Sequence, residues 1–388
     1  MGVDTAFYSI EPTPYGGRGA FARHQIAKGQ VILETTGPYA GVIFRKFRRE
    51  VCGACFAYAF ESGKNKWSVR LVEEEAVGGA GLWFCSSECR DDWISERVCN
   101  GDITWVLDLY RALERLIDQM SKAGRKKVKA ANSNPFHYLE NVSADQITQS
   151  FLEATWKQAE ELSRYDAKHE WTEELNEFEL DTVRYILDGL VRKVSEHLSS
   201  TVKSDRSPHG TGTWEDFAQL QDNELPFLIS KPYLLSSHIK TYLFIRHLCP
   251  LLKRSKGSCS ESQTSISKIS EYLETPTFVR MLLSRDPGNV FGIWDMAPEG
   301  EESEMLGWGA FTFASYFNHS CIPNIKKRRD KQKLIFYTLR DIQQGEEMCI
   351  SYTDETAPLK ERRALLNRNW FFQCCCAKCH DEQNEVAP

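Results

Sequence analysis

Two groups of cysteines have the spacing of structural zinc sites, namely Cys52-x2-Cys55 with Cys85-x3-Cys89, and Cys374-x-Cys376-x2-Cys379. The first group offers two close thiolate pairs, which together supply the tetrahedral set that a structural zinc ion needs. The second group offers three thiolates and needs a fourth ligand from elsewhere in the chain. Because the amino terminus lacks the form of a secretory signal, clustered cysteines indicate metal binding more than disulfides. No such spacing is found at Cys249, Cys259, Cys349 and Cys375, which are interpreted as buried apolar residues or free thiols.

Three short polar motifs supply groups that could bind and orient a ligand. They are Gly17-Arg18-Gly19, Asn318-His319-Ser320-Cys321, and Gly345-Glu346-Glu347 followed by Tyr352. Each motif is weak alone, because a lone Gly-x-Gly is common and a single His or strand Tyr is more often structural. Their value lies in their order and intervals along the chain.

Taken together with the last cysteine group, these motifs resemble the carboxy-terminal half of a SET-domain lysine methyltransferase. Phe84-Cys85-Ser86-Ser87-Glu88-Cys89, followed by Trp93, resembles the second half of a MYND zinc finger. The chain is therefore similar to SET- and MYND-domain (SMYD-type) enzymes, in a short fungal-like form that lacks their carboxy-terminal TPR-like domain. The resemblance covers residues 5–100 and 286–380. It implies S-adenosylmethionine as cofactor and methyl transfer to lysine side chains of proteins.

The resemblance also implies roles for individual residues. Tyr352 matches the catalytic tyrosine, Phe291 matches a wall of the lysine channel, and Trp370 stands where the family commonly has a second channel tyrosine. A tryptophan can line a channel but has no hydroxyl, which could change the number of methyl groups added or weaken activity. The cofactor-binding positions implied are Gly17, Arg18, Gly19, Asn289, Asn318, His319, Tyr352, Trp370 and Phe372, of which Phe372 would stack on the adenine.

By the same resemblance, two structural zinc ions are expected. Cys321 would be the fourth ligand of the second site, beside Cys374, Cys376 and Cys379 in a post-SET tail. The MYND-like module departs from its family: it has no middle cysteine pair, Arg97 replaces the ligand histidine and Gly101 replaces the last cysteine. The module is therefore expected to be a reduced one with a single zinc ion, held by Cys52, Cys55, Cys85 and Cys89.

The elements that must position these residues follow from the sequence pattern. Short strands are expected at 20–22 and 31–34, and again at 290–294, 333–339 and 347–352. Between them, Asp102 is a plausible N-cap, Ser143-Ala144-Asp145-Gln146 resembles a capping box ahead of a helix, and an apolar stripe from Leu180 to Leu198 predicts a helix. A further helix is expected at 276–283. Stretches 203–213 and 255–267 are expected to be exposed loops.

The predicted fold class is α+β: a β-rich SET fold split by a zinc module and a long helical insert, and closed by a zinc-binding tail. The expected segments are 1–50 (SET, amino-terminal part), 51–100 (reduced MYND-like module), 101–285 (helical insert), 286–354 (SET, carboxy-terminal part) and 355–388 (post-SET). Basic runs at Arg125-Lys126-Lys127 and Lys326-Lys327-Arg328-Arg329 could be nuclear import signals or solvated turns.

Partners and alternatives are weighed from charge and hydropathy. A net charge of -6 gives no reason to expect direct nucleic-acid binding. No apolar run is long enough for a transmembrane helix. A monomer in the cytoplasm or nucleus, acting on a protein lysine that could lie in a histone tail, is expected. Two alternatives remain open: a catalytically weak or inactive SET scaffold that binds protein partners, and a methyltransferase for a small amine.

Overall fold

The computed structural model describes residues 5–72, 81–98, 102–124, 135–165, 175–199, 210–253, 260–295 and 303–386. Its strands are β1 (Tyr8–Pro12), β2 (Arg18–Ala22), β3 (Val31–Glu34), β4 (Ala40–Ile43), β5 (Val69–Arg70), β6 (Trp83–Phe84), β7 (Val290–Trp294), β8 (Met305–Ala310), β9 (Ile325–Asp330) and β10 (Lys333–Thr338). The expected strands at 20–22, 31–34, 290–294 and 333–339 are confirmed to within two residues.

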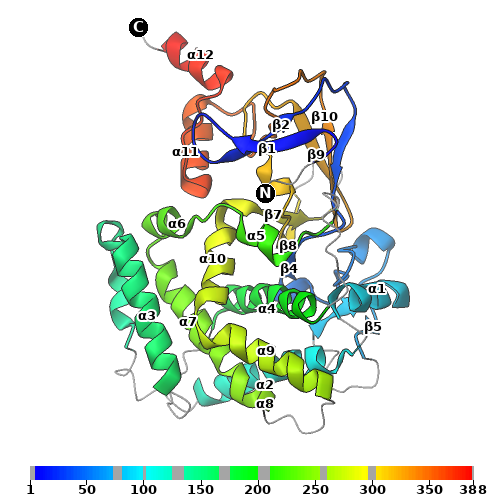
Figure 1. Cartoon of the computed structure of the whole chain (residues 1–388), viewed down its shortest axis with the longest axis vertical. Coiled ribbons are helices and arrows are strands. Elements are labelled where there is room, and N and C mark those ends of the chain that lie inside the picture. The colour runs from blue at the N-terminus through cyan, green and yellow to red at the C-terminus, as the bar shows by residue number, and fades with distance from the viewer. Residues whose placement is uncertain are drawn as a thin grey trace.

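Most helices come from the middle of the chain. They are α1 (Ser87–Arg97), α2 (Thr104–Gly124), α3 (Gln149–Tyr165), α4 (Glu177–Leu198), α5 (Trp214–Ala218), α6 (Glu224–Ser230), α7 (Leu234–Arg246), α8 (Leu248–Lys253), α9 (Ser260–Glu274) and α10 (Thr277–Asn289), with α11 (Leu359–Trp370) and α12 (Ala377–Val386) after the last strand. Figure 1 shows the long helices gathered in the lower part of the molecule, and most of the strands, with α11 and α12, above them.

The sheets join the two ends of the chain across the helical middle. β10 pairs antiparallel with both β3 and β9, and β8 pairs antiparallel with both β4 and β7. β1 and β2 form a hairpin, and β5 pairs with β6. Because β3 and β4 precede the helices while β7 to β10 follow them, the β-rich fold is split by an insert. This arrangement confirms the predicted α+β class.

Helix α4 connects the insert to the amino-terminal strands through buried charged groups. The Asp188 carboxylate accepts the Gly41 backbone N–H at 2.8 Å and lies 3.3 Å from Arg97 Nη1 of α1. Asp181 accepts the Arg45 backbone N–H at 3.0 Å. Buried ion pairs need such hydrogen bonds because desolvation of each charge is costly. The helix therefore fixes where β4 and the predicted zinc module sit relative to the insert.

One apolar core is shared by the predicted zinc module, the amino-terminal strands and the helical insert. It includes Cys52 and Trp93 of the predicted zinc module, Tyr39 before β4, and Leu187 of α4, all buried. A second cluster lies between the sheets and holds mostly aromatic and branched side chains, including Phe317 and Phe336. No helix in the described ranges is both long and apolar enough to span a bilayer.

Several local expectations are corrected. Residues 347–352 form no named strand and make only isolated bridges, because Glu347 meets Phe21 while Ile350 meets His319. The capping box at Ser143 is confirmed, but it caps the 3-10 helix Ala144–Gln146, and α3 starts only at Gln149. α10 continues beyond the expected end at 283 until non-helical dihedrals at Pro287 and Gly288 break it.

The expected loops and basic runs differ in outcome, because some lie in regular elements and others lie outside the described residues. Residues 260–267 belong to α9 rather than to a loop, because Ser262 and Ser265 are buried and Ser262 donates to Asp102 at 2.6 Å. Residues 203–209 and 255–259, Cys99, Cys259, Gly101 and the basic run Arg125-Lys126-Lys127 lie outside the described residues. The second basic run, Lys326-Lys327-Arg328-Arg329, lies in the edge strand β9.

Candidate functional site

The first cysteine group forms a compact cluster where β6 runs into α1. The Sγ atoms of Cys55 and Cys85 are 3.6 Å apart, and those of Cys85 and Cys89 are 3.3 Å apart. With Cys52, all four Sγ atoms lie within 4.8 Å of one another. Zinc–sulfur bonds of ~2.3 Å in a tetrahedron place sulfur atoms about 3.8 Å apart. The donor set therefore fits a structural zinc ion.

The second cluster brings Cys321 to the three tail cysteines, as the sequence predicted. Cys321 Sγ lies 3.6 Å from Cys379 Sγ and 4.0 Å from Cys374 Sγ, and Cys376 completes the group. Cys375 is exposed and lies outside it. Because Cys321 lies 53 residues before Cys374 in the sequence, a metal here would hold the tail against the loop before β9.

A buried arginine accompanies this second cluster. Arg362 on α11 is 2% exposed and donates from Nε to Cys321 Sγ at 3.3 Å and from Nη2 to Glu382 at 2.7 Å. Burial acts to lower the pKa of Arg362, but Glu382 and the thiols of Cys379 and Cys321 raise it overall. The guanidinium therefore stays charged, and it would offset the negative charge of the four thiolates of a metal-bound cluster.

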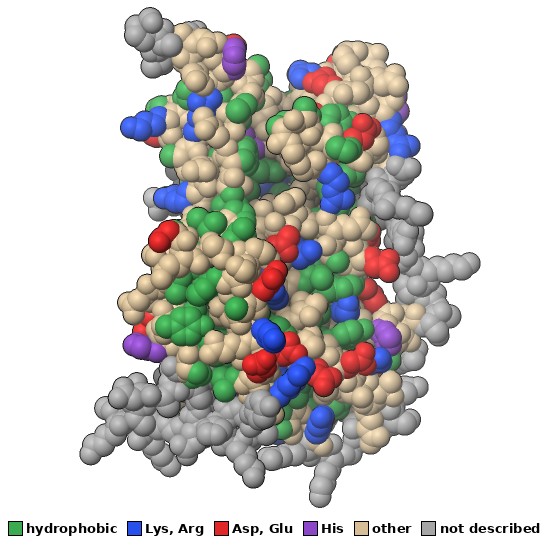
Figure 2. Space-filling model, turned by 60° about the vertical axis from the view of Figure 1, so that its left-hand side comes forward, with side chains coloured by type: hydrophobic (Ala, Val, Ile, Leu, Met, Phe, Trp, Pro, Cys, Tyr) green, Lys and Arg blue, Asp and Glu red, His purple; other side chains and the backbone are tan. Residues whose placement is uncertain are grey.

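A cleft of about 640 Å³ lies next to the second cluster. It is lined by residues 15–18 of the β1–β2 hairpin, by Asn318 and His319, by Tyr352, and by residues 370–376 of the tail. Its volume is that of a site for a cofactor-sized ligand. Figure 2 shows the surface hollowed between the lobe that carries the carboxy-terminal end of the chain and the neighbouring lobe.

One corner of the cleft is a hydrogen-bonded polar group. Asn318 Nδ2 donates to Glu347 Oε1 at 2.8 Å and to the Arg18 carbonyl at 3.1 Å, and Tyr15 also donates to Glu347. Gly19 lies against this group, and a Cβ there would come within 2.4 Å of Glu347 Oε1. A close approach between β2 and these side chains therefore explains Gly19 of the predicted motif.

Another part of the cleft wall is aromatic. The Tyr352 ring centroid lies 5.2 Å from that of Trp370 and 5.4 Å from that of His319, and the Phe372 ring centroid lies 6.1 Å from that of His319. His319 Nδ1 accepts the Tyr352 backbone N–H at 3.0 Å. Burial, with a contribution from Arg362, lowers the pKa of His319 to about 4. The imidazole is therefore neutral and fixed as part of the wall.

The Tyr352 hydroxyl has a defined partner. It donates to the Phe317 carbonyl at 2.8 Å. Burial raises the pKa of Tyr352 above its ordinary value, and the charges of Cys349 and Glu347 add to the rise. The hydroxyl therefore stays protonated, with its proton engaged by the carbonyl and its oxygen lone pairs free to accept a hydrogen bond.

Three predicted residues have other contacts than expected. Asn289 lines the cleft, but its side-chain amide donates to the carbonyls of Gln221 and Arg285 at 2.9 and 2.8 Å. The Arg18 guanidinium lies 5.1 Å from the Tyr316 ring centroid and donates to the backbone of the helical insert. Phe291 does not line this cleft; it packs edge-on against Phe311 at 5.8 Å between centroids.

Sequence reasoning did not identify several residues at the site. Tyr15 and Asn223 line the cleft, and Asn223 donates to the Pro287 carbonyl at 2.7 Å. Gly288 beside it has φ of +85°, and a Cβ there would come within 2.9 Å of Asn223 Nδ2. The Pro287-Gly288 pair was a visible signal for a tight turn. Tyr15, Asn223 and Arg362 carried no local signal, because their contacts join distant parts of the chain.

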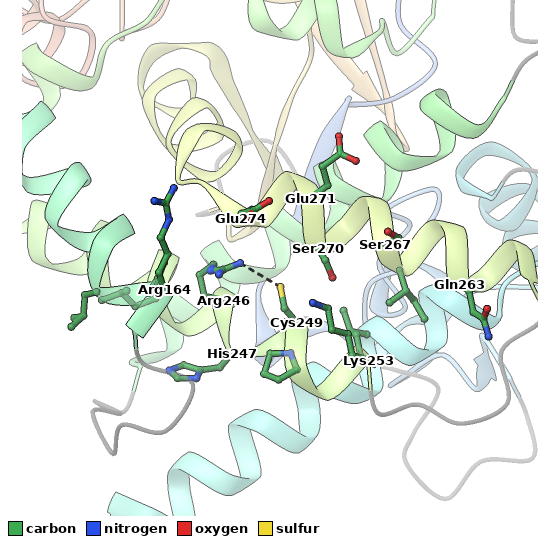
Figure 3. Close-up of a pocket in the computed structure, with 16 residues that line it drawn as sticks. Arg164, Arg246, His247, Cys249, Lys253, Gln263, Ser267, Ser270, Glu271 and Glu274 are labelled. Atoms are coloured by element: carbon green, nitrogen blue, oxygen red, sulfur yellow. Dashed lines mark hydrogen bonds between the residues drawn. The ribbon is translucent and has the colours of Figure 1, made fainter.

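A second cleft, of about 780 Å³, lies among α3, α7, α8 and α9. Figure 3 shows Arg246 directed towards Cys249, with Lys253 on α8 and Glu271 and Glu274 on α9. Arg246 donates to the Leu273 carbonyl at 3.0 Å. None of the predicted site residues lines this cleft, and its charged groups are of both signs.

Comparison with known proteins gives one family match. The model of the SET domain matches residues 17–353. The matched range starts in the glycine motif before β2 and ends just after Tyr352, so it includes the helical insert and most of the polar corner described above.

Individual relatives agree with this match. A potential protein lysine methyltransferase, SET6, from Saccharomyces cerevisiae is 27% identical over 400 residues, which cover 98% of this chain and 96% of the relative. Protein-lysine N-trimethyltransferase SMYD5 from Homo sapiens is 36% identical over 94 residues, which cover 23% of this chain and 22% of the relative. Histone-lysine N-methyltransferase ATXR2 from Arabidopsis thaliana is 45% identical over 85 residues, which cover 21% of this chain and 18% of the relative.

Proposed function

The chain belongs to the SET-domain family, and from that premise we propose that it is an enzyme that transfers a methyl group from S-adenosylmethionine to lysine side chains of proteins. The observation that carries the proposal is the cleft that joins the Asn318–Glu347 corner, the Tyr352 hydroxyl and the cysteine-anchored tail. The full-length similarity to a relative named a potential protein lysine methyltransferase supports it.

The residues that line the cleft have the chemistry needed to bind S-adenosylmethionine. Polar groups of the lining come from the backbone of Gly17 and Arg18 and from the side chain of Asn318, and ring surfaces come from His319, Trp370 and Phe372. When bound, S-adenosylmethionine supplies a methyl group on a positively charged sulfur. We propose that Gly17, Arg18, Gly19 and Asn318 hold its amino-acid part, and that Phe372 stacks on its adenine.

Tyr352 would position the reacting amine. Its hydroxyl proton is engaged by the Phe317 carbonyl, so its oxygen can accept a hydrogen bond from a lysine amine and fix the direction of attack. The aromatic wall excludes water from the same place. A lysine amine must also lose a proton, because its ordinary pKa is about 10.4, and a desolvating channel favours the neutral form.

We infer two structural zinc ions with separate roles. The first, held by Cys52, Cys55, Cys85 and Cys89, would order a reduced MYND-like module. The second, held by Cys321 and the tail cysteines, would keep residues 370–376 against the cleft. The substrate would be a lysine-containing protein segment, for which a histone tail is one class to test.

A radiolabelled methyl-transfer assay on histones and on a protein lysate tests the function. Replacing Tyr352 by Phe should reduce turnover ~100-fold or more, as loss of one oriented polar group in an active site does. S-adenosylmethionine affinity should change less than about twofold, because the hydroxyl faces the amine rather than the cofactor. Equal turnover by wild-type and Tyr352→Phe protein would contradict the assigned role.

A scaffold function is the alternative, and specific observations favour it. Trp370 offers no hydroxyl to the cleft, and the Asn289 amide is already engaged by backbone carbonyls. A scaffold would bind S-adenosylmethionine without turnover on any protein of the lysate. The same assay, combined with a binding measurement, therefore separates the two functions.

A further inference from the structure

Two adjacent glutamates, Glu346 and Glu347, lie beside β2 but have different surroundings. Their backbone is fixed to that strand, because the Ala22 N–H donates to the Glu346 carbonyl at 3.0 Å and the Met348 N–H donates to the Ala20 carbonyl at 2.8 Å. Side chains of consecutive residues in strand-like pairing alternate between two faces. The two carboxylates are therefore directed to different parts of the molecule.

The charge of Glu346 is compensated within the protein. Arg340 donates to both of its carboxylate oxygens, with a distance of 3.1 Å to Oε2. Asn324 Nδ2 donates to Oε1 at 3.0 Å, and the Gln343 N–H donates to Oε2 at 3.1 Å. Glu346 is not part of the cleft lining. This carboxylate therefore has its cation and its hydrogen bonds without any ligand.

Glu347 has hydrogen bonds but no cation. Asn318 Nδ2 and the Tyr15 hydroxyl both donate to the same oxygen, Oε1. Among the residues that the structure describes, no positively charged side chain lies within ion-pair distance of Glu347, and no hydrogen bond reaches its Oε2. A partly buried carboxylate without a cation is unfavourable, because part of its hydration is lost. The site is therefore built to receive a positive group.

Glu347 also sets the charge of the cleft. It is the one carboxylate among the described residues that line the cleft, and Arg18 is the one permanent cation among them. The Arg18 guanidinium is engaged elsewhere, since it donates to the Gln219 carbonyl and lies 5.1 Å from the Tyr316 ring centroid. A cationic group of a ligand in the cleft therefore has Glu347 as its partner.

We propose that Glu347 binds the α-ammonium group of S-adenosylmethionine, and that Tyr15 is a positioning residue for Glu347. The inference rests on the proposed function, in which the glycine motif and Asn318 hold the amino-acid part of this cofactor. Gly19 of that motif lies directly against Glu347, so the carboxylate is at the same corner. Oε1 is held by Asn318 and Tyr15, which leaves Oε2 for a charge-assisted bond to the ammonium.

The competing explanation is that Glu347 only supports the corner, as the acceptor for Asn318 and Tyr15. Glu347→Gln separates the two roles, because the amide oxygen of glutamine still accepts both hydrogen bonds while the negative charge is removed. A supporting role predicts no dependence on the charge of the ligand. Glu346→Gln is the matched control, since it removes the neighbouring charge outside the cleft lining.

The test is calorimetric binding of three ligands to the purified, zinc-loaded protein. They are S-adenosylhomocysteine and two analogues of it, in which hydrogen replaces either the α-ammonium or the α-carboxylate. All three have a neutral sulfur, so a sulfonium charge contributes nothing. Glu347→Gln should weaken S-adenosylhomocysteine and the analogue without carboxylate by ~10-fold or more. The analogue without ammonium should bind within about twofold of wild type, or tighter.

Glu346→Gln should bind all three ligands within about twofold of wild type. Tyr15→Phe should reproduce the ligand selectivity of Glu347→Gln with a smaller loss, roughly 3-fold, because the carboxylate stays but one bond that orients it is removed. A Tyr15→Phe loss that is equal for all three ligands, or no loss, would overturn the role of Tyr15.

Two results would overturn the role of Glu347 alone: unchanged binding of S-adenosylhomocysteine by Glu347→Gln, or an equal loss for all three ligands. The first would mean that the carboxylate meets another cation or only supports the corner, and the second that the corner has collapsed. Failure of the wild-type protein to bind S-adenosylhomocysteine or S-adenosylmethionine would overturn the proposed function itself.

Discussion

Replacing Gly19 by Ala tests how the polar corner of the cleft is built. A Cβ at this position would lie 2.4 Å from Glu347 Oε1 and 2.7 Å from Asn318 Nδ2. Both distances are below any ordinary contact, so these side chains must move. The two atoms are also hydrogen-bonded to each other at 2.8 Å, so the added methyl group separates a bonded pair.

The magnitude follows from that bond. A hydrogen bond to a charged group contributes about 1.5–3 kcal/mol, and water can replace part of it because Glu347 is only half-buried. We therefore expect the free energy of unfolding to fall by roughly 1–2 kcal/mol. Displacement of Asn318 should weaken S-adenosylmethionine binding at least ~10-fold, which corresponds to about 1.4 kcal/mol.

Calorimetry for the cofactor and denaturant unfolding measure the two effects. Gly29→Ala is the control, because Gly29 has φ of +81° and nothing within 4 Å of the added Cβ. That variant carries backbone strain of ~1–2 kcal/mol but should bind the cofactor normally. The reasoning is refuted if Gly19→Ala binds S-adenosylmethionine within about twofold of wild type.

Three other predictions follow from the metal clusters and the buried carboxylates. Cys376→Ser and Cys55→Ser should each remove one zinc ion by elemental analysis, but only Cys376→Ser should weaken cofactor binding, because the tail lines the cleft. Asp188→Ala should lower the free energy of unfolding by about 3–5 kcal/mol, since it leaves a buried guanidinium and a backbone N–H unpaired. The exposed Asp118→Ala should change it little. Burial raises the pKa of Asp286 to about 7, above its unfolded value of ~3.9, so the folded state holds this proton more tightly. Its contribution to stability is full below pH 4 and is lost as the pH rises through 7, so urea unfolding at pH 5.5 and 8 should show a smaller decline for Asp286→Asn than for wild type.

Features that depend on local spacing were predictable. The zinc-site cysteine pairs were predicted from their short spacing, and the helix from Leu180 to Leu198 was predicted from the period of its apolar residues. Both features are present in the structure. Strands β3 and β7 were also expected at their observed positions. In each case the pattern repeats within a few residues, so it is visible without knowledge of the rest of the chain.

Features that depend on distant contacts were not predictable. Residues 347–352 have strand-like composition, yet they form no regular ladder. Glu347 makes an isolated bridge to Phe21, and Ile350 makes another to His319. Arg362 lies beside cysteines whose nearest member in sequence is 12 residues away, so no local pattern links them. Asn289 shows the converse case: the residue is where it was expected, but neighbouring carbonyls that the sequence could not place occupy its amide.

Binding of S-adenosylmethionine to the purified protein, with zinc measured on the same sample, tests the central claim most directly. The cleft and its anchored tail predict micromolar binding at one site, with two zinc ions per chain. Absence of cofactor binding in protein that carries both zinc ions would contradict the assignment of this cleft and the methyl-transfer function with it.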